Sequence, residues 1–440
     1  MINSKWCALR GLNLVSASQL NFRVIVFFYT VLFLTEAYAV EVDGQVSTGF
    51  NYTSNAFLDE DSSVSELQRD LQLTSNVNHQ SRHVSAGANY NLIRRYYPHS
   101  FGDDTTLAGE ADISLAILPR SLRWDANHIR QNVFRDYNNN DTVDNREIRQ
   151  FLQTGPVFLF QLTPVDVLES SITRSWNSIE TQAQFDSETD SASASITHHL
   201  SPLMTASISL SQSKTDFENA NGYEISEQSI SITRELRKGS MSVLFGSNEV
   251  KQSGFASKSP SVSVDVTLDT DIAALNIDYY RHMTHSSTDI PISFTDESGL
   301  SYFGIIGLSE VVEEESFGVR VNKQLTAMVN IGLMGYRDTS TAQLSMVTRG
   351  REGIIFNSRY NYFLSGGASM NLMYSLNYLE SSSNDNDDTS ILHSLGANYQ
   401  RPVTQRISLD ANANFSLRDG SSYNDFDRSS ISLRLAYAFY

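Results

Sequence analysis

Apolar and polar residues alternate along most of this chain, and this two-residue period limits the possible folds more than any other feature. Between Ile407 and Leu417 every odd-numbered residue is apolar, and every even-numbered residue is serine, aspartate or asparagine. Residues 84–92, 206–210, 262–268 and 370–378 follow the same pattern. Because successive residues of a strand point to opposite faces, the pattern predicts β-strands with one apolar and one polar face. No comparable helical period competes with it.

The breaks between these strands are alternately short and long. Tight-turn signals with proline or glycine, which preset or permit turn dihedrals, occur near residues 118–120, 162–164, 200–202, 237–239, 365–367 and 401–402. Weaker turn candidates lie near His79, Asp269 and Gln324. Longer polar segments lie between the turns, at residues 58–65, 136–147, 216–223, 283–309, 381–388 and 419–428. The repeating unit is therefore a strand pair with one short and one long link.

Two kinds of fold fit a repeating all-β chain: a soluble sandwich or propeller, and a membrane barrel. Strands of about ten residues with apolar outer faces, short turns at one end and longer loops at the other are typical of outer-membrane barrels. The apolar faces contain no charge except Arg234, which lies near a turn and can extend to the membrane interface. Tyr360, Tyr362 and Tyr437 lie near strand ends, as interfacial aromatic girdles do.

We therefore predict an all-β fold, a transmembrane antiparallel up-and-down β-barrel of 16–20 strands in the bacterial outer membrane. Counting a strand on each side of nine short turns, plus the first and last strands, gives the upper value, and an even number places both termini in the periplasm. The last strand presents Ile431, Leu433, Leu435, Tyr437 and Phe439 on one face, so Tyr440 falls out of phase with the usual terminal aromatic residue.

The first 39 residues have the features of a signal peptide. Lys5, Arg10 and Arg23 form a basic leader, residues 24–34 are apolar, and Ala37-Tyr38-Ala39 fits the small-x-small cleavage pattern. We expect residues 1–39 to be removed and residues 40–440 to form the barrel. The single cysteine, Cys7, lies in the leader, which excludes disulfides and thiol chemistry from the mature chain.

The chain is acidic, with a formal net charge of −18, which argues against binding nucleic acid. The expected partners are outer-membrane lipid, lipopolysaccharide and the barrel assembly machinery. Acidic residues of the outer loops (Asp59, Glu60, Asp61, Glu310, Glu313, Glu314 and Glu315) and of the lumen (Asp265 and Asp410) favour passage of cations or neutral solutes. The same acids could instead bind divalent ions that bridge lipopolysaccharide. No plug-sized segment precedes the first strand near Gln45, which argues against a TonB-dependent transporter.

One segment has the spacing of a calcium-binding loop. Its oxygen ligands would be the side chains of Asp136, Asn138, Asn140, Asp144 and Glu147, with the Thr142 carbonyl. Asp141 replaces the glycine of such loops and no helix flanks the segment, so a solvated outer loop is the favoured alternative. The run at residues 384–388 is a weaker candidate for the same ion, and no other cofactor is expected.

No catalytic site is expected. His282 and His285 lie three residues apart, and strand alternation sends such side chains to opposite faces. His198 and His199 lie at a turn, and no serine-hydrolase or zinc-protease motif occurs.

Residues 122–175 carry a family resemblance. Trp124, Asp144-Asn145-Arg146, Thr154-Gly155-Pro156 and Leu162-Thr163-Pro164 resemble motifs of the uncharacterised outer-membrane β-barrels associated with exopolysaccharide and exosortase (PEP-CTERM) loci. The resemblance implies a role in secreting or anchoring surface polysaccharide, and it implies no catalytic residues.

Together these features predict a pore, or an export or docking channel, for a hydrophilic polymer such as exopolysaccharide. Its lumen would be lined by Ser, Asn, Asp and Tyr from the polar strand faces. The alternative is a non-conducting structural or adhesive barrel that acts through its surface loops. A barrel hydrolase is disfavoured for want of a catalytic motif.

Overall fold

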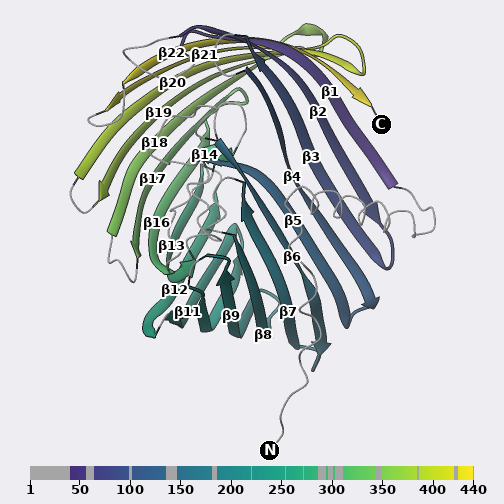
Figure 1. Ribbon diagram of the computed structural model, residues 1–440, viewed down its shortest axis with the longest axis vertical. Helices are drawn as coiled ribbons and strands as arrows, with labels where there is room; N and C mark the ends of the chain where they lie inside the picture. Colours follow the sequence, from purple (N-terminus) through teal and green to yellow (C-terminus); the bar gives the residue numbers. More distant parts are fainter. Residues whose placement is uncertain are drawn as a thin grey trace, which may run out of the picture.

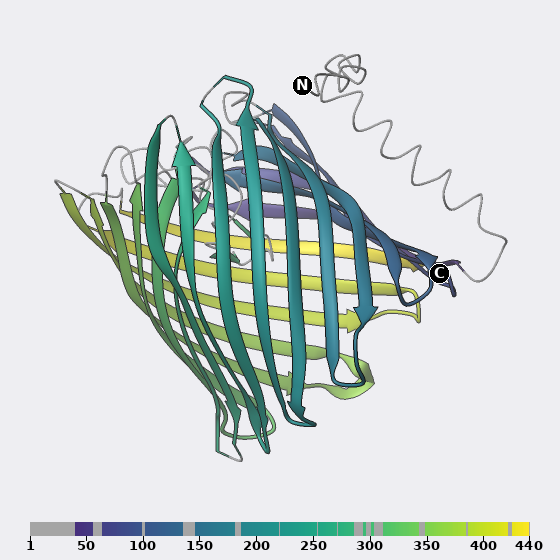
Figure 2. The same ribbon diagram turned by 90° about the horizontal axis from the view of Figure 1, so that it is seen from below.

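The chain forms a closed β-barrel in the computed structural model (Figures 1 and 2). The structure describes residues 40–55, 64–98, 102–134, 146–180, 186–219, 221–252, 254–270, 272–285, 294–295, 301–302, 311–342, 348–383, 386–420 and 425–439. A 20-stranded antiparallel sheet contains every strand except β14 and β15, and β1 pairs with β22 to close it. Both the predicted fold class and the predicted strand number are confirmed. The predicted signal peptide, residues 1–39, and Tyr440 lie outside the described residues.

Most strands are 12 to 17 residues long. Their bounds are β1 Val40–Thr53, β2 Glu66–Gln80, β3 Val84–Tyr97, β4 Gly102–Leu118, β5 Leu122–Phe134, β6 Arg146–Gln161, β7 Asp166–Ile179, β8 Ser187–Ser201, β9 Met204–Phe217, β10 Tyr223–Leu236, β11 Gly239–Gln252, β12 Phe255–Asp269, β13 Ala274–His285, β14 Phe294–Thr295, β15 Ser301–Tyr302, β16 Val311–Gln324, β17 Val329–Ala342, β18 Thr348–Phe363, β19 Ser369–Ser383, β20 Asn386–Pro402, β21 Ile407–Gly420 and β22 Phe426–Phe439. A short 3-10 turn, Ser365–Gly367, joins β18 to β19. Within the described residues, no helix is long and apolar enough to cross a membrane.

The two rims of the barrel differ in their connections. The first residue of β1 and the last of β22 lie at the rim that carries the nine short turns predicted from the sequence, so this is the periplasmic rim (Figure 2). All nine predicted short turns are found. The connections at the outer rim are less uniform than predicted, since β11 and β12 are separated only by residues 253–254. Glu313, Glu314 and Glu315, predicted in an outer loop, lie instead within β16 because the β13–β16 ladder extends to Val311.

Threonine shapes four of the periplasmic turns. The hydroxyls of Thr163, Thr270, Thr326 and Thr404 each accept the backbone N–H groups two and three residues later, at 3.0–3.3 Å. Such bonds replace backbone partners that the strands no longer supply. They explain why turns form near Asp269 and Gln324, where the sequence has no proline or glycine signal.

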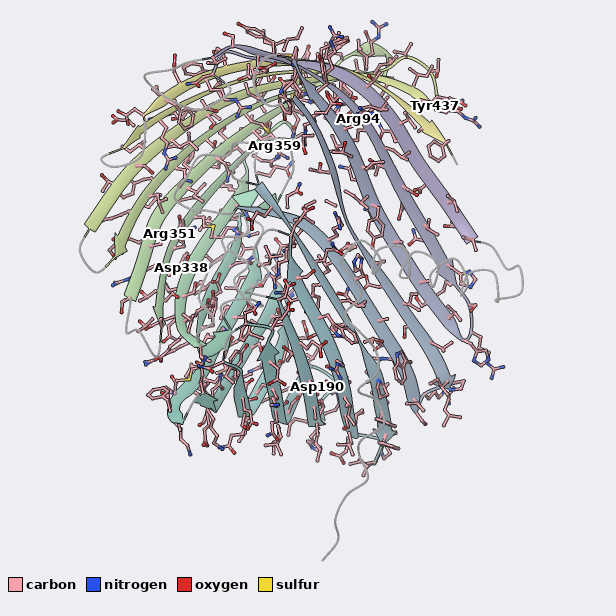
Figure 3. All side chains as sticks on the ribbon, in the orientation of Figure 1. Arg94, Asp190, Asp338, Arg351, Arg359 and Tyr437 are labelled. Carbon is pink, nitrogen blue, oxygen red and sulfur yellow. The ribbon has the colours of Figure 1, made fainter. Side chains whose placement is uncertain are left out.

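Side chains alternate between the two faces of the barrel wall (Figure 3). The outward positions of β22 are exposed and apolar: Ile431 is 64% exposed and Leu433 50%. Ile208, Leu210 and Phe245 form the same kind of surface on β9 and β11. Arg234 lies on the outward face of β10, close to the Arg237-Lys238 turn, as predicted. A continuous exposed apolar face on a closed sheet requires lipid around it.

The seam between β1 and β22 is closed by a glycine beneath an aromatic ring. A Cβ atom on Gly44 would lie 2.5 Å from Cζ of Phe439 and 2.7 Å from the carbonyl oxygen of Thr74. The ring of the last described strand residue therefore fits against β1 only because residue 44 has no side chain. Aromatic cover over strand glycines is a known device for fixing register.

We expect Gly44→Ala to destabilise the folded barrel by about 1–3 kcal/mol, the usual cost of overpacking. Gly335→Ala is the matched control, since nothing lies within 4 Å of a Cβ at that position. Urea unfolding in lipid vesicles measures both. Equal stability of the two variants would show that the seam does not depend on this contact.

Candidate functional site

The lumen is the candidate site, and one side of it is lined by hydroxyl groups. On β7 to β12 the inward positions are mostly serine and threonine. Several of these hydroxyls bond across strands: Ser171 with Ser193 at 2.7 Å, Thr197 with Ser207 at 3.0 Å and Thr233 with Ser242 at 3.2 Å. A hydroxyl is both donor and acceptor, so this surface offers hydrogen bonds without charge.

The other side of the lumen is rich in asparagine. Asn357, Asn371, Asn398, Asn412 and Asn414 occupy inward positions on β18 to β21. Asn412 Nδ2 donates to Ser432 Oγ at 3.3 Å, and Asn398 donates to Asn412. The polar strand faces in the sequence predicted both surfaces, but not their separation onto opposite sides.

Charged groups lie at the edges of these two surfaces and between them. Asp265 and Asp278 are direct cross-strand partners, and both face inward, so two acids stand side by side on β12 and β13. Asp338 on β17 accepts a hydrogen bond from Ser316 and is the cross-strand partner of Arg351. Figure 3 labels Asp338 and Arg351. The predicted lumen position of Asp265 is confirmed.

Asp410, the second acid predicted in the lumen, also faces inward on β21. It lies opposite Arg434 of β22, whose Nη2 is 3.3 Å from a carboxylate oxygen of Asp70. Asp70 is buried, whereas Arg434 is partly exposed to the lumen. Arg434 therefore forms an ion pair with Asp70 across the seam of the barrel and lies beside Asp410.

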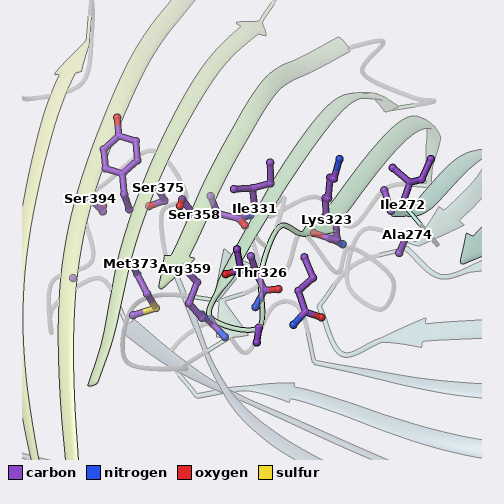
Figure 4. Close-up of a pocket in the computed structure, with 18 of the residues that line it drawn as sticks. Ile272, Ala274, Lys323, Thr326, Ile331, Ser358, Arg359, Met373, Ser375 and Ser394 are labelled. Carbon is purple, nitrogen blue, oxygen red and sulfur yellow. The ribbon is translucent and has the colours of Figure 1, made fainter. Parts of the chain in front are cut away.

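A cavity opens at the periplasmic half of the lumen (Figure 4). It has a volume of about 1350 Å³ and is lined by side chains from β12 to β21, among them Asn322, Asn330, Asn357, Arg359, Met373 and Ser394. By contrast, inward side chains near the outer rim are buried, including Glu66, Arg95, Glu147, Arg149, Phe217 and Tyr223. The lumen is therefore wider at its periplasmic end.

Part of this narrowing comes from β13 and β16. Beyond Arg281, β13 no longer pairs with β12 and continues with β16 alone. Met283 and Val311 then pack against the inward residues Phe217, Tyr223 and Val250. We call these five residues the hairpin root. The outer ends of β13 and β16 thus lean over the inner surface of β9 to β11.

Polar contacts hold the same hairpin in place. Ser259 Oγ on β12 donates to Glu313 Oε1 at 2.6 Å, and Arg281 Nε donates to the same oxygen at 2.7 Å. Asn248 Nδ2 donates to the Met283 carbonyl at 3.2 Å. Glu313 therefore serves as an anchor against the inner wall, a role that its place in an acidic run did not suggest.

The link between β13 and β16 also contains β14 and β15, an antiparallel pair. Figure 1 shows β14 inside the ring of strands, and β15 contacts β5, which lies on the far side of the barrel from β13 and β16. This pair therefore lies inside the barrel, next to β5.

Of the predicted calcium ligands, only Glu147 lies within the described residues. It is buried at the inward face of β6, near the outer rim. Asp136, Asn138, Asn140 and Asp144 lie outside the described residues, so the calcium site remains a prediction. The described residues contain no cluster of three or more His, Cys, Asp or Glu side chains able to hold a metal.

Two of the histidines singled out in the sequence, His282 and His198, lie in different parts of the described barrel. His282 lies opposite Glu314 and its ring is 5.3 Å from that of Tyr280. His198 is at the periplasmic end of β8, where its Nδ1 lies 2.7 Å from Asp166. These contacts fit structural roles at strand ends.

A closed sheet with an apolar outer face and a polar lumen requires a membrane that a barrel can span. The protein is an outer-membrane β-barrel. No protein-family model matches the chain, and no curated protein matches it significantly.

Solved structures of similar shape are outer-membrane proteins. The siderophore receptor PirA from Pseudomonas aeruginosa is 13% identical, with a TM-score of 0.48 over 92% of this chain and 81% of that one. OccK3 (OpdO) from the same organism is 12% identical, with a TM-score of 0.41 over 91% and 96%. OccAB4 from Acinetobacter baumannii is 9% identical, with a TM-score of 0.43 over 91% and 98%. Similarity at this level identifies no function, and the fold assignment rests on the strand ladder of this chain.

Proposed function

We propose that the protein is a channel through which hydrophilic solutes cross the outer membrane, with a neutral polymer such as exopolysaccharide as its substrate. The polar lumen carries this proposal: hydroxyls line β7 to β12, amides line β18 to β21, and a cavity of about 1350 Å³ opens at the periplasmic end. A sealed structural barrel would gain stability from an apolar interior, because buried polar groups need partners. The resemblance in residues 122–175 supports a polysaccharide substrate.

The channel proposal is tested by reconstituting the mature barrel into planar bilayers. Stable single-channel currents are expected. Folded barrel, confirmed by its β-sheet circular dichroism, that produces no current would overturn the proposal. The substrate is tested separately by comparing the exopolysaccharide released by wild-type cells with that released by cells lacking the gene.

The paired acids predict the selectivity of the channel. Removing two adjacent lumen carboxylates with Asp265→Asn and Asp278→Asn should weaken the preference for cations, since acids lining a pore attract them. The reversal potential in a salt gradient should move towards zero. Asp190→Asn is the control: Asp190 lies on the outward face beside Arg174, so this variant removes a charge outside the lumen and should leave the reversal potential unchanged. An unchanged reversal potential in the double variant would contradict this assignment.

A non-conducting barrel that acts through its surface remains the second candidate. The observation in its favour is the β14–β15 pair inside the lumen, which contacts β5. Such a barrel would bind its target at the outer rim and would show no current in the same bilayer experiment.

A further inference from the structure

A row of uncharged amide and hydroxyl side chains crosses the lumen face of neighbouring strands. Its members are consecutive cross-strand partners on β18, β19, β20, β21, β22 and β1, namely Asn361, Asn371, Asn398, Asn412, Ser432 and Asn51. We call this set the amide row. Each member lies at an inward position, because its neighbours along the strand, such as Tyr360, Tyr362 and Ile431, are exposed on the outer face.

The row rises through the membrane rather than circling at one depth. Asn361 is two residues from the periplasmic end of β18, whereas Asn51 is two residues from the outer end of β1. Cross-strand partners lie perpendicular to strands that tilt by about 35–45°, so the row is inclined to the membrane plane by the same angle. With strands about 4.8 Å apart, five steps cover roughly 24 Å along the wall.

The side chains of the row have hydrogen-bonding capacity to spare. Asn398 donates to Asn412, and Asn412 Nδ2 donates to Ser432 Oγ at 3.3 Å. Each amide has two N–H donors and a carbonyl with two lone pairs, so these bonds use only part of what it offers. All six residues are only partly buried and so face the lumen solvent.

The two neighbouring rows contain both charged and neutral side chains. The neighbouring row towards the periplasm contains Asp410, Arg434 and Asp70, and Arg434 forms an ion pair with Asp70. The neighbouring row towards the outer rim begins with Arg359 and Met373 and continues with Gly396, Asn414 and Ser430. The side chains of these last three residues are small or neutral and leave the adjacent amides accessible. A ligand on the amide row would therefore meet amide and hydroxyl groups along most of its length, with the Arg359 guanidinium beside Asn361 and the Asp410 carboxylate beside Asn412.

We infer that the amide row binds an uncharged, hydroxyl-rich chain, that is, a neutral saccharide polymer lying obliquely along the wall. The inference rests on the proposed channel function and names its substrate class. Hydroxyl groups match amides because both donate and accept hydrogen bonds. The spacing between neighbouring strands, about 4.8 Å, is also close to the length of one sugar residue in an extended chain.

Current recording through the mature barrel, with maltohexaose as a neutral probe, tests this site. Wild-type channels should show sugar-dependent interruptions of the current. The double variant Asn398→Leu with Asn412→Leu should shorten each interruption about tenfold, as expected from losing two net hydrogen bonds. Asn76→Leu with Asn89→Leu is the matched control, because these two cross-strand partners face the lumen on β2 and β3, outside the row. The control should leave the interruptions unchanged.

The outcomes are distinguishable. Absence of current in folded wild-type barrel would overturn the channel function itself. Current without interruptions by maltohexaose, or equal interruption times in row and control variants, would overturn the amide row as a saccharide site. A purely structural row would lower stability without changing the interruption time. If the leucine pair fails to fold, Asn398→Ser with Asn412→Ser replaces it, with a smaller shortening expected.

Discussion

Replacing Leu433 by arginine should destabilise the folded barrel by about 2–4 kcal/mol, the cost of a basic side chain facing lipid near the membrane midplane. Leu433 is 50% exposed on the outer face, and its cross-strand partners are Phe50 and Ala411. The arginine would have no acidic partner at that depth. Urea unfolding in lipid vesicles, followed by the fluorescence of Trp124 and Trp176, measures the change.

Ser432→Arg is the matched control, one residue away and facing the lumen. It should cost far less, because the lumen contains water and the Asp410 and Asp70 carboxylates lie in the adjacent row. Equal destabilisation at the two positions would mean that the assignment of lipid and lumen faces on β22 is wrong.

The second large effect is expected from the link between β13 and β16. Replacing residues 286–310 by a short turn removes β14 and β15 from the lumen, and single-channel conductance should rise severalfold. The hairpin root stays intact in this variant, so Met283 and Val311 keep their contacts with Phe217, Tyr223 and Val250.

Shortening the link between β1 and β2 at residues 56–63 is the control for losing an outer connection, and it should leave the conductance close to that of the wild type. If removing residues 286–310 leaves both folding and conductance unchanged, β14 and β15 do not limit the flow. Loss of all current from a folded variant would equally contradict this role.

The repeated alternation was enough to predict the fold. It fixes which side chains face lipid, and a one-residue error in register would exchange the two faces, so the pattern also limits the pairing. The turns were predicted where proline or glycine occurs. At Thr270 and Thr326 the signal was weaker, because a single hydroxyl performs the task that those residues perform elsewhere.

The arrangement of the lumen was harder to predict, because it depends on contacts between strands that are distant in sequence. The sequence shows asparagines on several strands, but only the register aligns Asn361 with Asn371 and Asn398 with Asn412. The inward lean of β13 was equally hidden. It depends on contacts of Met283 and Val311 with Phe217 and Val250. These residues lie on four different strands, and the alternation does not predict that they meet.

A contact on the outer face of the barrel was also not predictable from the sequence. The Tyr90 hydroxyl on β3 bonds to His128 on β5, so the tyrosine spans the intervening strand β4. It can do so because its cross-strand partner on β4 is Gly109, where a Cβ would lie 2.6 Å from the tyrosine ring. Taken one at a time in the sequence, Tyr90, His128 and Gly109 would each be assigned a different role.

Because β1 pairs with β22, the barrel is a closed ring in which the first and last strands have two neighbours like every other strand. Gly44 and Phe439 are direct partners at the periplasmic rim, so a short peptide could join the two ends of the chain there. The polypeptide could then be cut at any outer connection, such as residues 343–347, and every strand would keep both neighbours. The order in which strands are synthesised would change, while the finished barrel would not. Circular permutants of this chain would therefore separate the route of assembly from the stability of the assembled wall.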